Sequence, residues 1–156
     1  MGMIKLAALL IATLTMISAA ELPSKKYLNL AAIKTLAAAA EAEMARLKLS
    51  LTICIVDDGG NVIFLQKGEN MGMNTLQFAQ KKARYAALYR RPSKVAADTL
   101  KGGNLSVLAF PDGFPNQGGL PIIVDGQTIG GIAMSGAASE VDEAVSQVAI
   151  DALLKK

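Results

Sequence analysis

Residues 120–134, LPIIVDGQTIGGIAM, decide the fold class of this 156-residue chain. Two apolar runs flank Asp125-Gly126, a pair that is favoured in tight two-residue hairpin turns. The glycine pair Gly130-Gly131 inside the second run indicates a bulge, or the close approach of another backbone segment. The stretch therefore predicts an antiparallel hairpin.

Residues 51–65 predict a second hairpin, because two short apolar runs flank the turn-forming sequence Asp57-Asp58-Gly59-Gly60. The two carboxylates either serve the geometry of the turn alone or face a metal or a substrate. Cys54 lies in the first run and is the only cysteine of the chain, so it has no intrachain disulfide partner. We expect it to be a small buried apolar residue.

Apolar residues at helical spacing predict helices before and after these hairpins. The first helix covers residues 30–49, with Asn29 as its N-cap. The second begins at Thr75 and ends at Arg91-Pro92, because the residue before a proline is disfavoured in a helix.

Two serines are predicted to cap the remaining helices. Ser93 caps a short helix through Leu100, and Ser139 begins the terminal helix with an acid three residues later. Residues 107–110 are predicted to form a short strand. Because hairpins dominate this order of elements, the sequence predicts an α+β fold in which helices flank an antiparallel sheet.

The N-terminal 20 residues predict a secretory signal peptide. Residues 6–17 form an apolar run behind Lys5, and the small residues Ser18-Ala19-Ala20 precede the expected cleavage before Glu21. At about twelve residues the run is shorter than the roughly 20 that span a bilayer. We therefore expect one domain over residues 21–156, a periplasmic or secreted location, and no membrane association after cleavage.

The composition excludes several classes of function. Sixteen basic and 13 acidic residues give a net charge of +3, far short of the basic excess expected of a nucleic-acid-binding module. The absence of histidine removes imidazole-based triads and imidazole metal sites. The groups that remain for catalysis are carboxylates, lysines and tyrosines.

Positive charge gathers on and just beyond the helix that begins at Thr75. Tyr85 and Tyr89 lie one turn apart on the same side of this helix, and together with the neighbouring cations they form a candidate surface for a flat anionic ligand. The alternative is a solvated basic face with the tyrosines at a subunit contact. The cations are Lys81, Lys82, Arg84, Arg90 and Arg91.

Three further segments carry candidate roles. The loop at residues 111–119, rich in proline and glycine, is either the rim of a pocket for a small anion or a wide surface loop. Met71-Gly72-Met73 offers thioether ligands or apolar filler. Ser135-Gly136 either lines a pocket or turns the chain into the terminal helix.

Several motifs, taken in order, resemble one family over residues 28–154. They are Ile55 to Asn61 after the first helix, Lys82-Ala83 in the helix that ends at Arg91-Pro92-Ser93, Gly118 to Ile122, Asp125-Gly126, and Gly130 to Asp142. The chain resembles the GlcG/HbpS-like proteins, also called the haem-degrading domain family, which includes the C-terminal domain of PduO-type proteins.

The resemblance implies a profilin-like α+β fold, self-association into dimers or larger rings, and haem binding, which is established for some members. Members that hold haem tightly tend to use a histidine near the pocket, and this chain has none, so no haem ligand is carried over by position. A threonine associated with haem in the HbpS-like branch is matched here by Ser93.

We therefore expect an exported protein that binds haem or a related tetrapyrrole without turnover. Tyr85 is the first candidate for an iron ligand or stacking partner, Tyr89 belongs to the same surface, Arg84 and Arg90 would contact propionates, and Ser93 is the family-matched hydroxyl. The alternatives are an enzyme or enzyme accessory that acts on a small organic acid, and a structural oligomer without a ligand.

Overall fold

The computed structural model describes residues 20–155, so the predicted signal peptide lies outside the described residues except for Ala20. In the described part of the chain, no helix combines the length and the apolar character needed to cross a membrane.

One antiparallel sheet runs through the described domain, with the strand order β2-β1-β4-β3. Both predicted hairpins are confirmed, and the two inner strands join them, with Ile55 opposite Ile132. Asp57 serves the turn of the first hairpin, where its Oδ1 accepts hydrogen bonds from the backbone N–H of Gly59 and of Asn61. The strands are β1 (Thr52–Asp57), β2 (Val62–Gln66), β3 (Gly119–Val124) and β4 (Gln127–Ser135).

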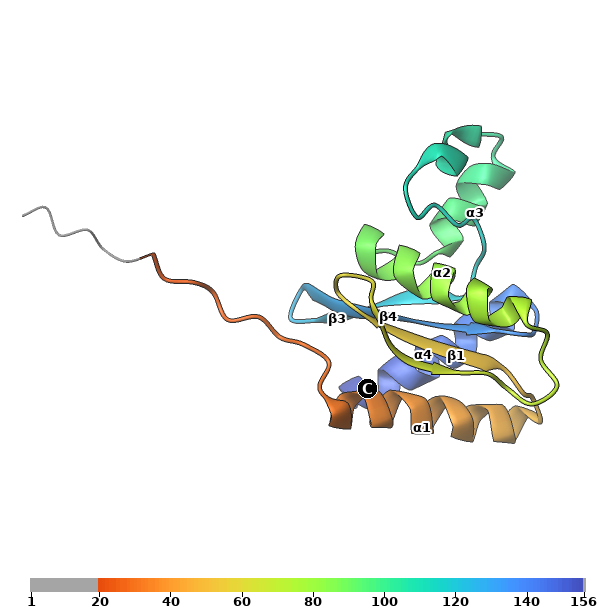
Figure 1. Ribbon diagram of the computed structural model, residues 1–156, viewed down its shortest axis with the longest axis horizontal. Helices are drawn as coiled ribbons and strands as arrows, with labels where there is room; N and C mark the ends of the chain where they lie inside the picture. Colours follow the sequence, from red (N-terminus) through yellow and green to blue (C-terminus); the bar gives the residue numbers. More distant parts are fainter. Residues whose placement is uncertain (1–19, 156) are drawn as a thin grey trace, which may run out of the picture.

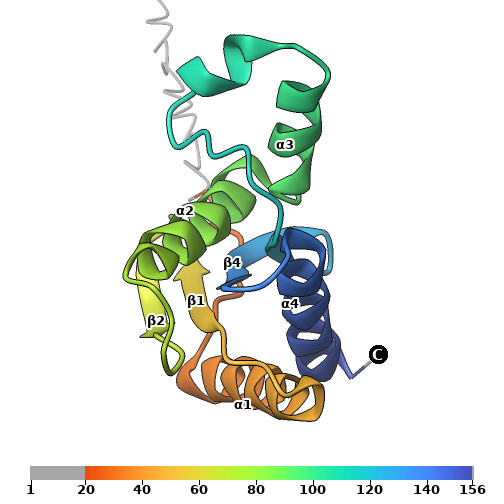
Figure 2. The same cartoon turned by 90° about the vertical axis from the view of Figure 1, so that its right-hand side faces the viewer.

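Helices cover both faces of this sheet, as predicted, and the fold is α+β (Figure 1). The helices α1 (Leu30–Leu47) and α4 (Ser139–Leu154) pack against each other beneath the sheet. The helix α2 (Asn74–Tyr89) lies on the opposite face, across β1, β4 and β3. Figure 2 shows the resulting three layers end-on.

The two faces of the sheet are packed differently. Large aliphatic side chains such as Leu36 and Ile53 fill the space between the sheet and the α1–α4 layer. Under α2 the core is built of small residues, and a Cβ added to Gly131 would lie 2.4 Å from the carbonyl oxygen of Ala83. The close backbone approach predicted for the Gly130-Gly131 pair is therefore confirmed. Cys54 is buried in this layer, as predicted, and burial raises the pKa of its thiol to about 12.

An arm formed by α3 (Lys94–Lys101) and the 3-10 helix η1 (Leu105–Ala109) projects beyond the sheet (Figures 1 and 2). The short strand predicted at residues 107–110 is wrong, because η1 occupies most of this segment. Asn104 begins η1 by accepting a hydrogen bond from the backbone N–H of Ser106 at 3.0 Å. A run of four apolar residues does not have a strong enough preference for a strand to oppose such a local cap.

The predicted caps have mixed outcomes. Asn29 caps α1, since its Oδ1 accepts a hydrogen bond from the backbone N–H of Ala32. Ser93 occupies the N-cap position of α3, as predicted, but its side chain makes no capping hydrogen bond. The prediction is wrong for Ser139, because Ala138 occupies the N-cap position of α4. Their hydroxyls bind distant segments instead, and these tertiary partners are invisible to a local pattern.

Candidate functional site

Two neighbouring pockets, each of about 280 Å3, open beside α2 where the loop after η1 returns to the sheet. The two pockets meet at a pair of aromatic rings: Phe114 lines the first pocket, Phe78 lines the second, and the centroids of the two rings lie 5.4 Å apart. The pocket that we call the outer pocket is lined by Lys81, Arg84, Phe110, Asp112, Gly113 and Phe114. The inner pocket is lined by Asn74, Thr75, Phe78, Lys82, Asn116, Ser135, Gly136, Ala137, Ser139 and Asp142.

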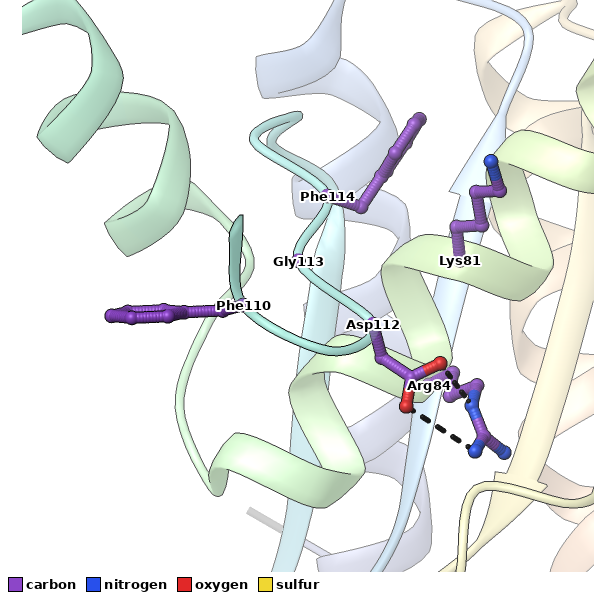
Figure 3. A pocket seen from close by; sticks show the side chains of 6 residues that line it. All are labelled: Lys81, Arg84, Phe110, Asp112, Gly113 and Phe114. Atoms are coloured by element: carbon purple, nitrogen blue, oxygen red, sulfur yellow. Dashed lines mark hydrogen bonds and ion pairs between the residues drawn. The ribbon is translucent and has the colours of Figure 1, made fainter. Parts of the chain in front are cut away.

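Charged side chains and an aromatic ring form the wall of the outer pocket (Figure 3). Arg84 donates from Nε to Asp112 Oδ1 at 2.7 Å and from Nη2 to Oδ2 at 3.3 Å, and this pairing raises the pKa of Arg84. The Nζ of Lys81 lies 5.5 Å from the centroid of the Phe114 ring, whereas the side chain of Phe110 points away from Lys81 and Arg84. The pocket therefore combines one cation beside a ring with a second cation held by a carboxylate.

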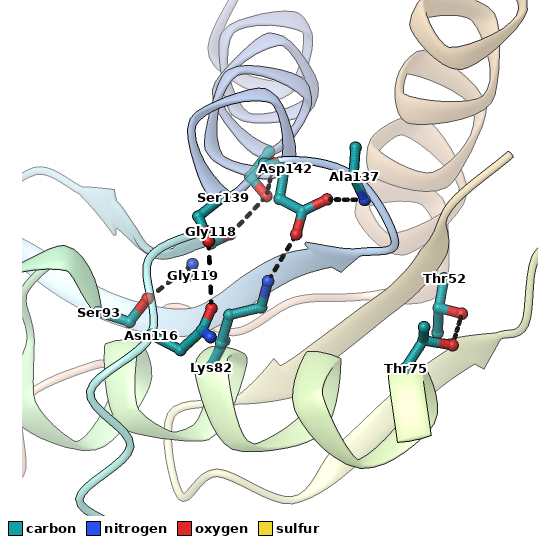
Figure 4. A network of polar contacts seen from close by, with 11 residues as sticks. Thr52, Thr75, Lys82, Ser93, Asn116, Gly118, Gly119, Ala137, Ser139 and Asp142 are labelled. Atoms are coloured by element: carbon teal, nitrogen blue, oxygen red, sulfur yellow. Dashed lines mark hydrogen bonds and ion pairs between the residues drawn. The ribbon is translucent and has the colours of Figure 1, made fainter. Parts of the chain in front are cut away.

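A buried ion pair forms the base of the inner pocket (Figure 4). Lys82 Nζ donates to Asp142 Oδ2 at 2.9 Å, and the two side chains are only 1% and 4% exposed. Asp142 Oδ1 accepts a hydrogen bond from the backbone N–H of Ala137, so both oxygens of this carboxylate have donors. Burial lowers the pKa of Lys82 below its ordinary value, although the charges of Asp142 and Glu143 act in the opposite direction.

The Gly118-Gly119 backbone closes over Lys82. A Cβ added to Gly118 would lie 2.7 Å from Lys82 Nζ, and one added to Gly119 would lie 2.3 Å from the Lys82 carbonyl oxygen. Side chains at these two positions would collide with the lysine, so the glycines are required by the way in which Lys82 is buried.

Both predicted tyrosines lie at the base of the arm and not in either pocket. Tyr85 is fully buried against Ala96 and Val107, and its hydroxyl accepts a hydrogen bond from Arg91 Nε at 3.0 Å. Tyr89 stacks on Tyr85 with 4.6 Å between ring centroids and donates its hydroxyl proton to the carbonyl of Pro111. Tyr85 is buried and each hydroxyl has a hydrogen-bond partner within the chain, so the structure places both candidate residues in the packing of the arm.

The other predicted residues are also separated. Ser93 is buried and exchanges two hydrogen bonds with Gly119, accepting at its Oγ and donating from its backbone N–H. Arg90 ends α2 and lines a different pocket beside Pro121. Of the five predicted site residues, only Arg84 lines one of the two pockets beside α2.

The sequence analysis places Lys82 among the cations of a basic surface, either ligand-binding or solvated, whereas the structure buries it. Its spacing carried the signal: Lys82 is three residues after Ala79 and four before Ala86, on the stripe that α2 buries. A lysine on an apolar stripe requires a buried partner, which is Asp142. The loop at residues 111–119 does line both pockets, and Ser135-Gly136 lines the inner one.

The described residues contain no cluster of three or more histidine, cysteine or acidic side chains that could hold a metal ion. Met73 is exposed, and the sulfur of Met71 would lie 2.6 Å from a Cβ added to Gly136. Met71 therefore packs beside the inner pocket and does not reach the outer one.

Comparison with known proteins places this geometry in a family. The GlcG protein of Escherichia coli K12 is 33% identical over 98 residues, which cover 63% of this chain and 73% of that protein. A crystal structure of HbpS superposes with a TM-score of 0.75 at 26% identity and covers 86% of this chain and 94% of HbpS. The crystal structure of a PduOC–haem complex has a TM-score of 0.74 at 24% identity, with coverages of 81% and 95%.

The family model described as haem-degrading protein HbpS-like matches residues 28–151. This match begins just before α1 and ends within α4, so it spans the sheet, the arm and both pockets. The chain belongs to the HbpS-like family.

Proposed function

We propose that this protein is an exported binding protein for haem or a related tetrapyrrole, which it holds at the outer pocket without turnover. The observation that carries the proposal is the wall formed by Lys81, Arg84 and the ring of Phe114. A tetrapyrrole presents a flat ring system and carboxylate side groups, which match an aromatic face next to cations. The family and the PduOC–haem complex support the same ligand class.

The residues of the outer pocket fit the periphery of haem but not its iron. Among the six lining residues there is no imidazole, thiolate, thioether or phenol, and the carboxylate of Asp112 is bound to Arg84. A volume of about 280 Å3 is also below the roughly 300–1,000 Å3 typical of pockets for drug-sized ligands, so most of the macrocycle would remain outside. The proposed binding therefore uses the ring and the carboxylates alone.

Comparative titration of hemin and metal-free protoporphyrin IX tests this proposal. If the iron has no protein ligand, we expect the two compounds to bind with dissociation constants within about threefold of each other. Replacing Lys81 by Ala weakens both by about tenfold, in the range of a charge-assisted contact. The matched control is Arg90→Ala, which removes a cation outside the pocket and leaves both affinities unchanged. Hemin binding a hundredfold tighter than the metal-free ring would contradict peripheral binding.

Export is part of the proposal and is supported by the apolar run at residues 6–17 and by the small residues before Glu21. N-terminal sequencing of protein from its native compartment checks it. A mature chain that begins at Glu21 is expected, and recovery of an intact Met1 in the membrane fraction would contradict export.

Self-association is also proposed, with the arm as its contact surface. Leu105, Leu108 and Phe110 expose 66%, 58% and 45% of their surfaces there, which is unusual for three neighbouring apolar side chains. Light scattering should show at least a dimer, and Leu105→Ser combined with Leu108→Ser should shift it toward monomer. A wild-type protein that stays monomeric at high concentration would contradict this part.

A further inference from the structure

A groove of about 330 Å3 lies at the β3 edge of the sheet, between the end of α2 and the second half of α4. None of the residues that line it lines the outer or the inner pocket, so it is a separate feature of the surface. The groove is lined by Arg90 and Arg91 from the end of α2, by Leu120 and Ile123 from β3, and by Ile150 from α4, among others.

The base of the groove is aliphatic. Leu120 and Ile150 are buried there, and Leu154 adds a further apolar side chain from the last turn of α4. Ile123 is 43% exposed, although it belongs to a strand of the sheet. An apolar molecule that covers this side chain removes its surface from water, which favours binding.

Two guanidinium groups line the same groove without a carboxylate partner. In the part of the chain that the structure describes, neither Arg90 nor Arg91 forms an ion pair. Arg91 donates from Nε to the Tyr85 hydroxyl at 3.0 Å, which leaves the N–H groups of its two Nη atoms. Because guanidinium groups bind carboxylates in a bidentate manner, the charge of the groove favours a ligand with a carboxylate head.

The edge of β3 is not suited to a further strand. Both backbone groups of Gly119 are bound to Ser93, since its N–H donates to Ser93 Oγ and its carbonyl accepts from the Ser93 N–H. Pro121, two residues further along, has no N–H to donate. A strand that adds to an edge requires alternating free donors and acceptors. The groove therefore favours an alkyl chain over an extended peptide or a strand of a second copy.

We propose that this groove binds a free medium-chain fatty acid, with its carboxylate at the two arginines and its alkyl chain along β3 and α4. The volume of about 330 Å3 lies within the roughly 300–1,000 Å3 typical of small-molecule pockets. The site does not share a residue with the outer pocket, so the proposal does not rest on tetrapyrrole binding.

The first test compares ligands of equal chain length and opposite charge. In an NMR titration, octanoate should shift the backbone amide signals of Leu120, Ile123 and Ile150 and leave that of Phe114 in the outer pocket unchanged. Octylammonium has the same chain and the opposite charge, and we expect it to bind at least tenfold more weakly. From hexanoate to octanoate, each added CH2 should strengthen binding by about threefold to fourfold, the value of one buried methylene.

Variants of exposed residues test the head and the chain separately. Arg90→Gln should weaken octanoate binding by about threefold to tenfold, as expected for a charge-assisted contact at an exposed site. Its matched control is Lys101→Gln, which removes an exposed cation of the arm and should leave the affinity unchanged. Ile123→Ser should reduce the gain per CH2, whereas Ile63→Ser, on the opposite edge strand, should not.

Four outcomes would overturn the proposal. They are equal binding of octanoate and octylammonium, absence of shifts at the groove amides, full octanoate affinity in Arg90→Gln, and shifts at these amides with vesicles of an anionic phospholipid but not with octanoate. The last result would assign the groove to a membrane surface and not to a free fatty acid. Lys81→Ala should weaken tetrapyrrole binding and leave octanoate binding unchanged, so the two proposed sites fail or stand separately.

Discussion

The outer and inner pockets have the same volume and adjoin along α2, but their ion pairs lie in different surroundings. Arg84 and Asp112 are 40% and 35% exposed, whereas Lys82 and Asp142 are almost completely buried. Water screens the first pair, so its charges are available to a ligand and contribute little to stability. The second pair is shielded, so its removal affects the fold as well as any ligand. The two pockets therefore differ in how far their charges are exposed to water.

The largest expected effect comes from breaking the buried pair. Lys82→Met leaves the carboxylate of Asp142 in the core without its cation, which should lower the free energy of unfolding by about 3–5 kcal/mol. Urea denaturation followed by circular dichroism measures this loss. Arg84→Met, which breaks the exposed pair, should cost less than about 1 kcal/mol.

The double variant Lys82→Met with Asp142→Leu separates the two causes of that loss. It removes both charges and leaves apolar side chains of similar size, so most of the stability should return. If the double variant is as unstable as Lys82→Met alone, the lysine contributes through packing and not through its charge.

A somewhat smaller effect is expected from the backbone that closes over Lys82. Gly119→Ala places a methyl group 2.3 Å from the Lys82 carbonyl oxygen, so β3 and α2 have to move apart. We expect a loss of about 1–3 kcal/mol in the free energy of unfolding, as for other overpacked cores. Gly103→Ala is the control: the site has open space around it, and only the positive φ of 85° disfavours alanine. A loss no larger than in the control would contradict the close packing.

The pH dependence of stability should also distinguish the two pairs. Because the folded-state pKa of Lys82 is lowered, the native protein releases this proton at a lower pH than the unfolded chain does. Between the folded pKa and the ordinary value of 10.5, the unfolded state binds more protons, so this group makes the protein more stable as pH rises. Subtracting the unfolding curves of the Lys82→Met, Asp142→Leu double variant from those of wild type isolates this slope. Arg84 has a raised pKa and adds no slope below pH 10. A flat or falling difference would contradict the lowered pKa.

The sequence predicts the hairpins and the three main helices because their signals are local. The Asp125-Gly126 turn and the Asn29 cap act within a few residues and need no tertiary partner. The site is harder to predict because its contacts connect distant residues. Lys82 and Asp142 are 60 positions apart, and either residue alone has an ordinary explanation as a surface charge or a first-turn acid.

The packing of the two tyrosines at the end of α2 is hard to predict for a similar reason. A basic helix face with two tyrosines has the same pattern whether the rings face a ligand or another part of the chain. Here the arm returns over that face, and it engages Tyr85 and Tyr89 in its own packing. The sequence contains no periodic pattern from which the position of the arm, or the 3-10 helix within it, could be predicted.

The smallest expected effect concerns the competition between Asp112 and a ligand for Arg84. Asp112 lies at a positive φ of 54°, a conformation that asparagine also accepts, so Asp112→Asn changes the charge with little backbone strain. Without the carboxylate, Arg84 loses a competitor and the pocket gains net positive charge. Protoporphyrin IX should then bind about threefold to fivefold more tightly, which corresponds to less than about 1 kcal/mol, and fluorescence titration measures this change. Asp98→Asn removes an exposed carboxylate that pairs with Lys94 on the arm, and it should leave the affinity unchanged. Equal gains in both variants would assign the effect to net charge, and only a gain specific to Asp112→Asn would place the ligand's carboxylate at Arg84.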